Sequence, residues 1–409
     1  MRVLIVNSYF SSVGGAEVVA YDTYKALQRK NNEVFFFALD KKPFFEENYE
    51  YAKYFPKNKF TTLEYIKNPI RYYYDKNSTS KLKEFIKAIK PDIIHLHNIL
   101  GFSPLILEAC KNIPSILTIH QADIICPSGT LMHKSKELCS QRYCRNSNYL
   151  YCILNNCANN NIERTLRRSL LTYLYNKKLN NIDKYITPSY ALKDVVVKAN
   201  IGIQNEDITV INNFLPQLSH SELPKFSKGK NFLYVGRLSK EKDVMTLLKA
   251  FKELPPDIKL HIAGSGQEEK KLKRFVRDNK LSNVKFLGFL NREQVNQELN
   301  NCIATILPCN WFEIFGMTNI ESLIKGKPVI GSNVGGIPEI VENNVNGLLF
   351  EPTNIEQLKV CILTYWNNSE LAIEHGKNGY KKAITQYTEE RYYDELMKVY
   401  EETINESRK

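Results

Sequence analysis

The sequence predicts an α/β protein made of two domains, each built on a parallel β-sheet. The chain has 409 residues, which exceeds what one hydrophobic core normally supports, so two domains of about 200 residues are expected. Short apolar segments typical of strands alternate with segments of helical periodicity, and this order builds parallel sheets. Glycine-containing turns follow several of the strands, at the edge where open α/β sheets bind their ligands.

The composition is that of an ordinary globular protein, with 43% hydrophobic and 24% charged residues. The net charge of +12 implies an acidic partner, which could be a nucleotide, a nucleic acid or an anionic membrane. Nine cysteines, an odd number, do not suggest a secreted disulfide framework. The apolar start at residues 1–7 is too short for a signal peptide, so we expect a cytoplasmic protein.

The first domain opens with a strand, a glycine turn and a helix. Residues 2–7 are apolar, residues 11–17 contain Gly14 and Gly15, and residues 18–29 have helical periodicity. This turn differs from the G-x-G-x-x-G of dinucleotide-binding enzymes. The elements expected next are a strand at 33–39, a helix at 81–90, a strand at 92–96, a helix at 104–111 and a strand at 115–119.

Polar residues directly follow two of these strands. His97 and Asn98 come after the strand at 92–96, and His120 comes after the strand at 115–119. The carboxyl ends of parallel strands are where ligands bind, which makes these residues candidates for a site. A single histidine in such a position is more often structural than catalytic, and both interpretations stay open here.

A loop-rich insertion at 122–161 is rich in cysteine. Two pairs in it each have four intervening residues: Cys139 with Cys144, and Cys152 with Cys157. Such pairs can hold a structural zinc ion, with His133 as an alternative ligand, although the usual gap is two residues. The other interpretation is a set of free thiols that pack a lobe of the domain.

Residues 162–184 have the pattern of a basic amphipathic helix. Such a helix can lie on an anionic lipid surface. The other interpretation is a domain helix whose apolar stripe packs on the sheet while its charges stay in water. The residues that form the pattern are Leu166, Leu170, Leu171, Leu174 and Leu179 with Arg164, Arg167, Arg168, Lys177, Lys178 and Lys184.

Three more elements are expected to complete the first domain, which we place at 1–215. The polar stretch at 216–230 contains Pro216 and Pro224 and has no periodicity, which predicts a linker between the domains. The three elements before it are a strand at 184–187, a helix at 189–199 and a strand at 208–211.

The second domain, expected at 231–385, opens with a strand that ends at Gly236. Arg237 follows directly, and Lys242 comes five residues later, just before a helix. Two cations at the end of a strand suit a diphosphate, although any solvated surface can carry an Arg and a Lys. Gly264 lies in the turn after the next strand. The elements expected after it are a helix at 267–278, a strand at 284–287, a helix at 292–300 and a strand at 303–307.

The stretch from Glu313 to Glu321 is a loop that runs into a helix. Gly316 lets the backbone pass close to a ligand, and the first N–H groups of the helix at 317–325 attract phosphate. Carboxylates accept hydrogen bonds from hydroxyls, so the two glutamates indicate a neutral polyol beside an anion. The backbone N–H groups expected at the phosphates are those of Phe315, Gly316, Met317 and Thr318.

Further motifs follow this stretch: a strand at 328–331, the turn Gly335-Gly336, the helix start Ile337-Pro338-Glu339 and the segment Gly347-Leu348-Leu349-Phe350. Each glycine turn alone is typical of any α/β domain. Together with Glu313-x7-Glu321 they closely resemble the retaining glycosyltransferases of family 4. The resemblance implies the GT-B fold, in which two Rossmann-like parallel-sheet domains face each other across a cleft.

The resemblance also implies a role for each domain. In this family the first domain binds the acceptor, the second binds the nucleotide sugar, and the last helix, here at 386–409, crosses back to the first domain. Catalytic roles are implied for His120, Arg237, Lys242 and Glu313. Donor binding is implied for Gly14, Gly15, Gly236, Gly264, Phe315, Gly316, Met317, Thr318 and Glu321, and acceptor binding for Glu17, His97 and Asn98. The departures are Gln121, where relatives have aspartate, and Asp243, where many have glycine.

We therefore expect a retaining hexosyltransferase that uses a UDP-sugar or GDP-sugar and a glycan or lipid-linked glycan acceptor in cell-surface polysaccharide biosynthesis. The chain contains no Asp-x-Asp triplet, so Arg237, Lys242 and helix N-termini are expected to stabilise the leaving diphosphate without a metal ion. Same-face attack is favoured over double displacement with Glu313 as the nucleophile.

Two other functions stay open. A nucleotide-sugar 2-epimerase has the same two-lobed architecture and needs no acceptor. A non-catalytic binder of nucleic acid or membrane would account only for the basic charge. The sequence contains no nucleic-acid-binding signature, and its basic residues are not interleaved with aromatic residues, so no nucleic-acid partner is expected. The expected location is the cytoplasm, peripheral to the inner face of the membrane.

Overall fold

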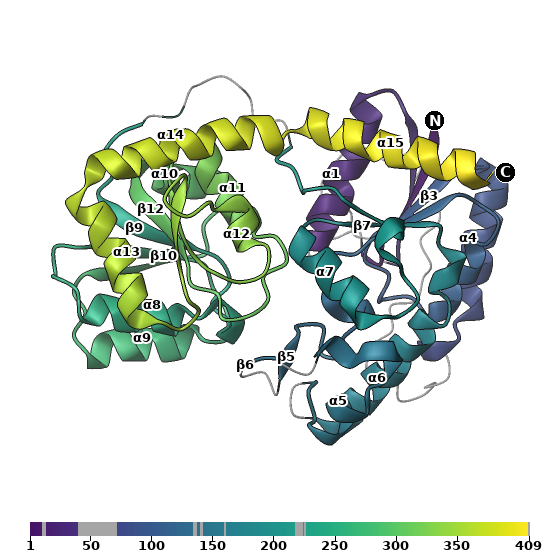
Figure 1. Cartoon of the computed structure of the whole chain (residues 1–409), viewed down its shortest axis with the longest axis horizontal. Helices are drawn as coiled ribbons and strands as arrows, with labels where there is room; N and C mark the ends of the chain where they lie inside the picture. Colours follow the sequence, from purple (N-terminus) through teal and green to yellow (C-terminus); the bar gives the residue numbers. More distant parts are fainter. Residues whose placement is uncertain are drawn as a thin grey trace. The chain divides into compact units, whose positions relative to one another are not determined.

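The computed structural model forms two compact units (Figure 1). Unit 1 comprises Met1–Asn212 and Tyr392–Lys409, and unit 2 comprises Asn213–Arg391. Each unit contains a six-stranded parallel sheet, so the predicted α/β class with two parallel-sheet domains is confirmed. The structure describes residues 1–9, 14–39, 72–133, 137–139, 142–158, 161–216, 224 and 226–407.

The sheet of unit 1 has the strand order β2-β1-β3-β4-β7-β8. Its central strands are apolar runs that are buried on both faces, as expected for a parallel sheet covered by helices. The strands are β1 (Arg2–Val6), β2 (Glu33–Phe37), β3 (Ile93–Leu96), β4 (Ser115–Thr118), β7 (Lys184–Thr187) and β8 (Ile208–Val210). The longer helices are α1 (Gly15–Arg29), α4 (Lys76–Ile89), α6 (Ile162–Asn176) and α7 (Tyr190–Ala199).

The sheet of unit 2 has the order β11-β10-β9-β12-β13-β14, which is the 3-2-1-4-5-6 order of a Rossmann domain. Its strands are β9 (Asn231–Val235), β10 (Leu260–Ala263), β11 (Val284–Gly288), β12 (Cys302–Leu307), β13 (Val329–Ser332) and β14 (Gly347–Phe350). Its helices are α8 (Val244–Lys252), α9 (Glu269–Asp278), α10 (Arg292–Asn301), α11 (Met317–Ile324), α12 (Ile337–Ile340), α13 (Ile355–Asn367) and α14 (Ser369–Gln386).

The last helix, α15 (Glu389–Ser407), packs on unit 1 from Tyr392 onward (Figure 1). Tyr392 Oη lies 2.8 Å from Thr23 Oγ1 of α1, and Tyr400 Oη lies 2.7 Å from Nδ1 of His95 in β3. These buried hydrogen bonds join the end of the chain to its first helix and to the sheet. The C-terminal segment of unit 1 therefore stabilises the N-terminal segment, from which it is separated in the sequence by the whole of unit 2.

Some expected elements differ in the structure. The predicted basic helix at 162–184 is wrong in its last third, because α6 ends at Asn176 and Lys184 already begins strand β7, which pairs with β4. The helix expected at 104–111 is a 3-10 helix, Pro104–Ala109. Most of the predicted linker, 217–223 and 225, and the turn residues 11–13 lie outside the described residues. No helix in the described part of the chain is long and apolar enough to cross a membrane.

The turns after β9 and β10 run against each other at the carboxyl edge of the sheet in unit 2. Gly236 N–H donates to the carbonyl of Ala263, and a Cβ at Gly264 would lie 1.9 Å from the carbonyl oxygen of Gly236. The φ angle of Gly264 is +139°, a value that other residues rarely adopt. Gly264 therefore allows two ligand-facing turns to pack closely.

We predict that Gly264→Ala destabilises unit 2 more than Gly288→Ala does. Both glycines have positive φ, but a Cβ at Gly288 would meet no atom within 4 Å. Backbone strain alone should cost about 1 to 3 kcal/mol in Gly288→Ala, and the clash should add at least about 2 kcal/mol in Gly264→Ala. Thermal unfolding of the two variants measures the difference, and equal losses would contradict the close packing of the turns.

Candidate active site

The loops of the site in unit 2 leave the sheet where its strand order reverses. That point lies between β9 and β12, and open α/β sheets bind ligands in the crevice formed there. The loop after β9 carries Arg237 and Lys242, and the loop after β12 carries Trp311 and Glu313. The topology of unit 2 thus brings together the two motifs that the sequence singled out.

A buried ion pair joins these two loops. Lys242 Nζ lies 2.5 Å from Glu313 Oε2, and the side chains are 16% and 11% exposed. The same carboxylate oxygen accepts from Trp311 Nε1 at 3.1 Å and from Cys309 Sγ at 3.5 Å. All three contacts are made by Oε2, and none of them involves Oε1. Lys242 also lies over the ring of Trp311, 5.5 Å from its centroid.

The pair is charged at neutral pH. Burial alone would raise the pKa of Glu313, but the charge and hydrogen bond of Lys242 outweigh it, and the pKa is lowered. Burial likewise disfavours the Lys242 ammonium, yet Cys309 and Glu313 raise the pKa of Lys242 above its ordinary value. A lysine and a glutamate are therefore held ionised in a nearly dry site, where electrostatic interactions are stronger than in water.

The N-terminus of α11 follows this loop and has no side-chain cap. Gly316, the N-cap residue, has φ +93°, and a Cβ there would lie 2.7 Å from Nδ2 of Asn319. Asn319 Nδ2 is itself buried without a hydrogen-bond partner. The first-turn N–H groups of a helix have no partner within it, so the start of α11 is suited to bind an anion.

The longer helices of the described residues differ in their N-terminal capping. Side chains cap six helices: α4 by Asp75, α6 by Asn161, α7 by Ser189, α10 by Asn291, α13 by Asn354 and α14 by Asn368. Four long helices have no side-chain cap: α1, α8, α9 and α11. Each of these four follows one of the predicted ligand loops, which contain Gly14, Lys242, Gly264 and Glu313.

The remaining predicted residues of unit 2 differ in their environment. Arg237 is exposed, and its nearest acid is Glu241 at 3.9 Å, so it does not join the Lys242 pair. The Phe315 side chain packs in the core against Tyr387, which leaves only its backbone for a ligand. Burial raises the pKa of Glu321, with Arg292 opposing the shift. Gly335 has φ +60° and lies against the backbone of Glu313, so this glycine turn supports the loop.

In unit 1 the predicted residues also gather where the strand order reverses, between β1 and β3. Asn98 Nδ2 donates to Glu17 Oε1 at 2.8 Å, and the Asn98 backbone N–H donates to Oδ1 of Asn7 at 2.8 Å. A Cβ at Gly14 would lie 3.1 Å from Glu17 Oε2. Glu17 is therefore held by the loop after β3, and Gly14 leaves room for its carboxylate.

The two candidate histidines are in contact. His97 Nδ1 lies 2.9 Å from His120 Nε2, and the rings are stacked with centroids 5.1 Å apart. Burial lowers the pKa of His120 to about 4, and burial together with the neighbouring histidines lowers that of His97. Both imidazoles are thus neutral at pH 7. His97 is almost fully buried behind His120, so the structure favours support of His120 over direct contact with an acceptor.

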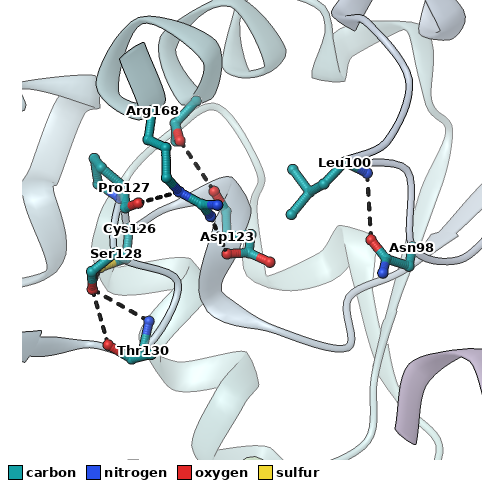
Figure 2. A network of polar contacts seen from close by, with 9 residues as sticks. Asn98, Leu100, Asp123, Cys126, Pro127, Ser128, Thr130 and Arg168 are labelled. Carbon is teal, nitrogen blue, oxygen red and sulfur yellow. Dashed lines mark hydrogen bonds and ion pairs between the residues drawn. The ribbon is translucent and has the colours of Figure 1, made fainter. Parts of the chain in front are cut away.

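Asp123 and Arg168 form a second polar group (Figure 2), and Asp123 lines the same cavity as the two histidines. Arg168 Nη2 lies 2.8 Å from Asp123 Oδ1, and Arg168 Nε donates to the carbonyl of Pro127 at 2.5 Å. Burial raises the pKa of Asp123, and Arg168 opposes the shift. A cavity of about 30 Å³ is lined by His97, Asn98, His120, Gln121 and Asp123, and it is large enough for one water or hydroxyl group.

The cysteines do not form the predicted set of four. Cys144 and Cys152 lie 3.3 Å apart and are buried with Cys157 and Tyr149, whereas Cys139 is outside this cluster. Across the described residues, no group of three or more His, Cys, Asp or Glu side chains is placed to hold a metal ion. The contacts of Cys144, Cys152 and Cys157 are those of packed thiols, and the zinc ion stays a prediction.

The sequence analysis missed residues that the structure places at both sites. Trp311 and Cys309 contact Glu313, and each lies within four residues of it in the sequence. Trp311 is one of only two tryptophans, which was an available signal. Asp123 lies three residues after His120, and its role depends on Arg168, which is 45 residues away. No local pattern reveals that contact.

Comparisons with known proteins match both parts of the chain. The family described as "Glycosyltransferase Family 4" matches residues 13–216, and "Glycosyl transferases group 1" matches residues 217–382. An uncharacterized glycosyltransferase of Methanocaldococcus jannaschii is 28% identical over 98% of both chains. The lipopolysaccharide 1,6-galactosyltransferase of Escherichia coli is 30% identical, over 53% of this chain and 61% of its own length.

Solved structures share the fold. Anabaena HepE in complex with UDP superposes with a TM-score of 0.70 at 18% identity, covering 98% of this chain and 100% of its own. A sucrose-phosphate synthase from Thermosynechococcus elongatus superposes with a TM-score of 0.71 at 18% identity, covering 98% of both chains. At this level of identity the similarity establishes the fold alone.

We predict that breaking the Lys242–Glu313 pair destabilises unit 2 more than removing both charges. Glu313→Gln should cost about 3 to 5 kcal/mol, because it leaves the Lys242 ammonium buried without its partner. The double variant Glu313→Gln/Lys242→Met should recover part of this loss. Denaturant unfolding of the two single variants and the double variant gives the coupling energy, and strictly additive losses would contradict the pairing.

The pair also predicts a pH dependence of stability. Because the folded pKa of Glu313 is below its ordinary value of 4.5, its contribution is present above that pH and is lost as the pH falls through the folded pKa. Lys242, with a raised pKa, contributes below its ordinary value of 10.5 and loses that contribution as the pH rises through its folded pKa. The stability difference between wild type and double variant should therefore shrink below about pH 4.5.

Proposed function

Because this chain belongs to the family 4-like glycosyltransferases of the GT-B fold, we propose that it is a retaining hexosyltransferase. It moves a sugar from a nucleoside-diphosphate sugar to a glycan or lipid-linked glycan in cell-surface polysaccharide biosynthesis. Unit 2 binds the nucleotide sugar, and unit 1 binds the acceptor. The observation that carries the proposal is the uncapped N-terminus of α11 directly after the loop that holds the Lys242–Glu313 pair.

The geometry of unit 2 supports binding of a diphosphate beside a sugar. The free N–H groups at the start of α11 and the Lys242 ammonium stabilise the negative charge that develops on the leaving phosphate. Glu313, held through Oε2, accepts hydrogen bonds from sugar hydroxyls through Oε1, and Glu321 accepts from the ribose. Arg237, which is exposed, closes on the diphosphate when the ligand binds.

Same-face attack needs no protein base, because the departing phosphate takes the proton of the acceptor hydroxyl. His120 then orders the sugar as a neutral hydrogen-bonding group, in keeping with its lowered pKa. His97 fixes the ring orientation of His120 through their 2.9 Å contact. Glu17 and Asn98 bind acceptor hydroxyls, and Asp123 adds a carboxylate at the cavity beside His120.

We further propose that the reaction is independent of divalent metals. The chain contains no Asp-x-Asp triplet of the kind that holds a metal ion on a diphosphate. Lys242 and the helix N-termini supply positive charge at the place where such an ion would act. A structural zinc ion at the cysteines is not part of the proposal.

The relatives suggest the type of donor and acceptor. HepE is described in complex with UDP, and the Escherichia coli relative is named for transfer to lipopolysaccharide. We propose a UDP-sugar ahead of a GDP-sugar as donor, and a lipid-linked acceptor. An acceptor of this kind places the enzyme in the cytoplasm, as a peripheral protein at the inner face of the membrane.

Thermal stability with UDP, GDP and ADP in EDTA tests the donor site. Ligands that bind the folded protein raise its Tm, and a ligand at 100 times its Kd stabilises by about 2.7 kcal/mol. We expect one nucleotide to raise the Tm without added metal and Glu321→Ala to reduce that shift at least about tenfold in apparent affinity. Glu253→Ala, at the C-terminal end of α8, should keep the full shift.

The outcomes of this test separate the alternatives. No shift with any nucleotide would overturn the transferase proposal. A shift that disappears equally in Glu321→Ala and Glu253→Ala would place the nucleotide elsewhere. Conversion of the sugar to its 2-epimer, without release of the nucleoside diphosphate, would establish the epimerase instead.

A further inference from the structure

Helix α6 exposes four of its large apolar residues and buries three small polar ones, although Leu171 and Tyr175 are also buried. Ile162, Leu166, Leu170 and Tyr173 are 49%, 48%, 46% and 39% exposed. Their spacing of four, four and three residues puts them on one face of the helix. Thr165, Ser169 and Thr172 are buried on the other side. A domain helix normally buries most of its large apolar residues, because burial of apolar groups stabilises the fold.

The short helix α5 (Leu150–Leu154) packs beside α6 and extends the exposed apolar area. Leu150 is 60% exposed and Leu154 is 75% exposed. We define the α5–α6 surface as Leu150, Leu154, Ile162, Leu166, Leu170 and Tyr173. Soluble proteins seldom expose so many large apolar side chains side by side, and such areas mark interaction sites.

An open groove of about 580 Å³ runs along this surface. Leu166, Leu170 and Tyr173 of α6 form one side of it, and Tyr73 and Tyr149 also line it. Its volume lies in the range of sites that bind small ligands. The groove is mainly apolar, so it suits a hydrocarbon chain better than a sugar.

Basic residues accompany the apolar face. Arg164 is exposed on α6, Arg167 lines the groove, and Lys177 Nζ lies 5.4 Å from the centroid of the Tyr173 ring. Glu163 is the acidic residue of α6. Arg167 also lies over the Tyr72 ring, with Cζ 5.6 Å from its centroid. Arg168 pairs with Asp123, and Lys178 pairs with Glu108.

We propose that the α5–α6 surface docks on an anionic lipid membrane, with the groove taking a lipid chain and Arg164, Arg167 and Lys177 at the level of the headgroups. The proposal rests on the proposed function, since it names the partner that would present a lipid-linked acceptor to unit 1. The occupant is a membrane because exposed leucines, a tyrosine and basic side chains on adjoining helices match the apolar and anionic layers of a lipid surface. The surface is narrower than the segment 162–184, since residues 178–184 take part in the fold of unit 1.

Flotation of the full chain with lipid vesicles tests the proposal. One set of vesicles is phosphatidylcholine alone, and in the other a third of the lipid is phosphatidylglycerol. We expect binding to the anionic vesicles that weakens as salt is raised. Leu154→Gln/Leu166→Gln should lower the partition coefficient on the order of a hundredfold, because each inserted leucine contributes about tenfold. Arg164→Gln/Arg167→Gln should lower binding to the anionic vesicles only.

Phe289→Gln/Val360→Gln is the matched control, because these residues are 81% and 64% exposed in unit 2. It should bind vesicles as the wild type does. Absence of vesicle binding by the wild type, or an equal loss in the control, would overturn the proposal. A dimer in sedimentation that Leu154→Gln/Leu166→Gln dissociates would overturn it as well, since a second copy would then cover the surface.

The nucleotide measurements separate this proposal from the proposed function. Vesicle binding without any nucleotide-induced rise in Tm would retain the surface and remove the transferase. A nucleotide-induced rise in Tm without vesicle binding would retain the transferase and overturn the membrane-docking surface.

Discussion

The buried ion pair between Lys242 and Glu313 is the interaction on which the site of unit 2 depends. The two residues come from loops that follow different strands of the sheet, and they meet because the strand order reverses between those strands. Each charge is acceptable in this buried place only because the other is there. The pair ties the loop that leads into α11 to the loop after β9. One contact thus links the stability of unit 2 to the position of this loop, and it places the cation that the proposed reaction would use.

The helices of the described residues fall into two groups, those with a side-chain N-cap and those without one. The six capped helices are anchored by an Asp, Asn or Ser at the N-cap, which satisfies an N–H group within the fold. Helices α1 and α11 instead have Gly14 and Gly316 at the N-cap, and these residues have no side chain that could accept from the first N–H groups. These ends lack the stabilising hydrogen bond of a cap, so a ligand could accept from their N–H groups instead. The long helices without caps therefore begin beside the predicted ligand loops of both units.

Local patterns in the sequence were enough to predict the fold and to select candidate site residues. Apolar runs located the strands, and the Glu313-x7-Glu321 spacing with its glycine turns located the loop before α11. Contacts between distant residues could not be predicted, such as Lys242 with Glu313, which are 71 residues apart, or Arg168 with Asp123. The leucines of 162–184 predicted a helix but not which of its faces is buried. The buried residues Thr165 and Thr172 have side chains that are typical of a protein surface. The cysteine spacing suggested pairs, whereas the fold brings Cys144 to Cys152.

The central claim is that unit 2 helps to cleave the bond between a sugar and a diphosphate through Lys242 and the start of α11. The most direct measurement is release of nucleoside diphosphate from UDP-glucose, UDP-galactose and GDP-mannose in EDTA, with the released sugar followed by proton NMR. The account predicts slow release from at least one donor, with the first-formed sugar in the same anomeric configuration as in the donor, and loss of release in Lys242→Met. Release that requires a divalent metal, inverted configuration, or no release from any donor would contradict it.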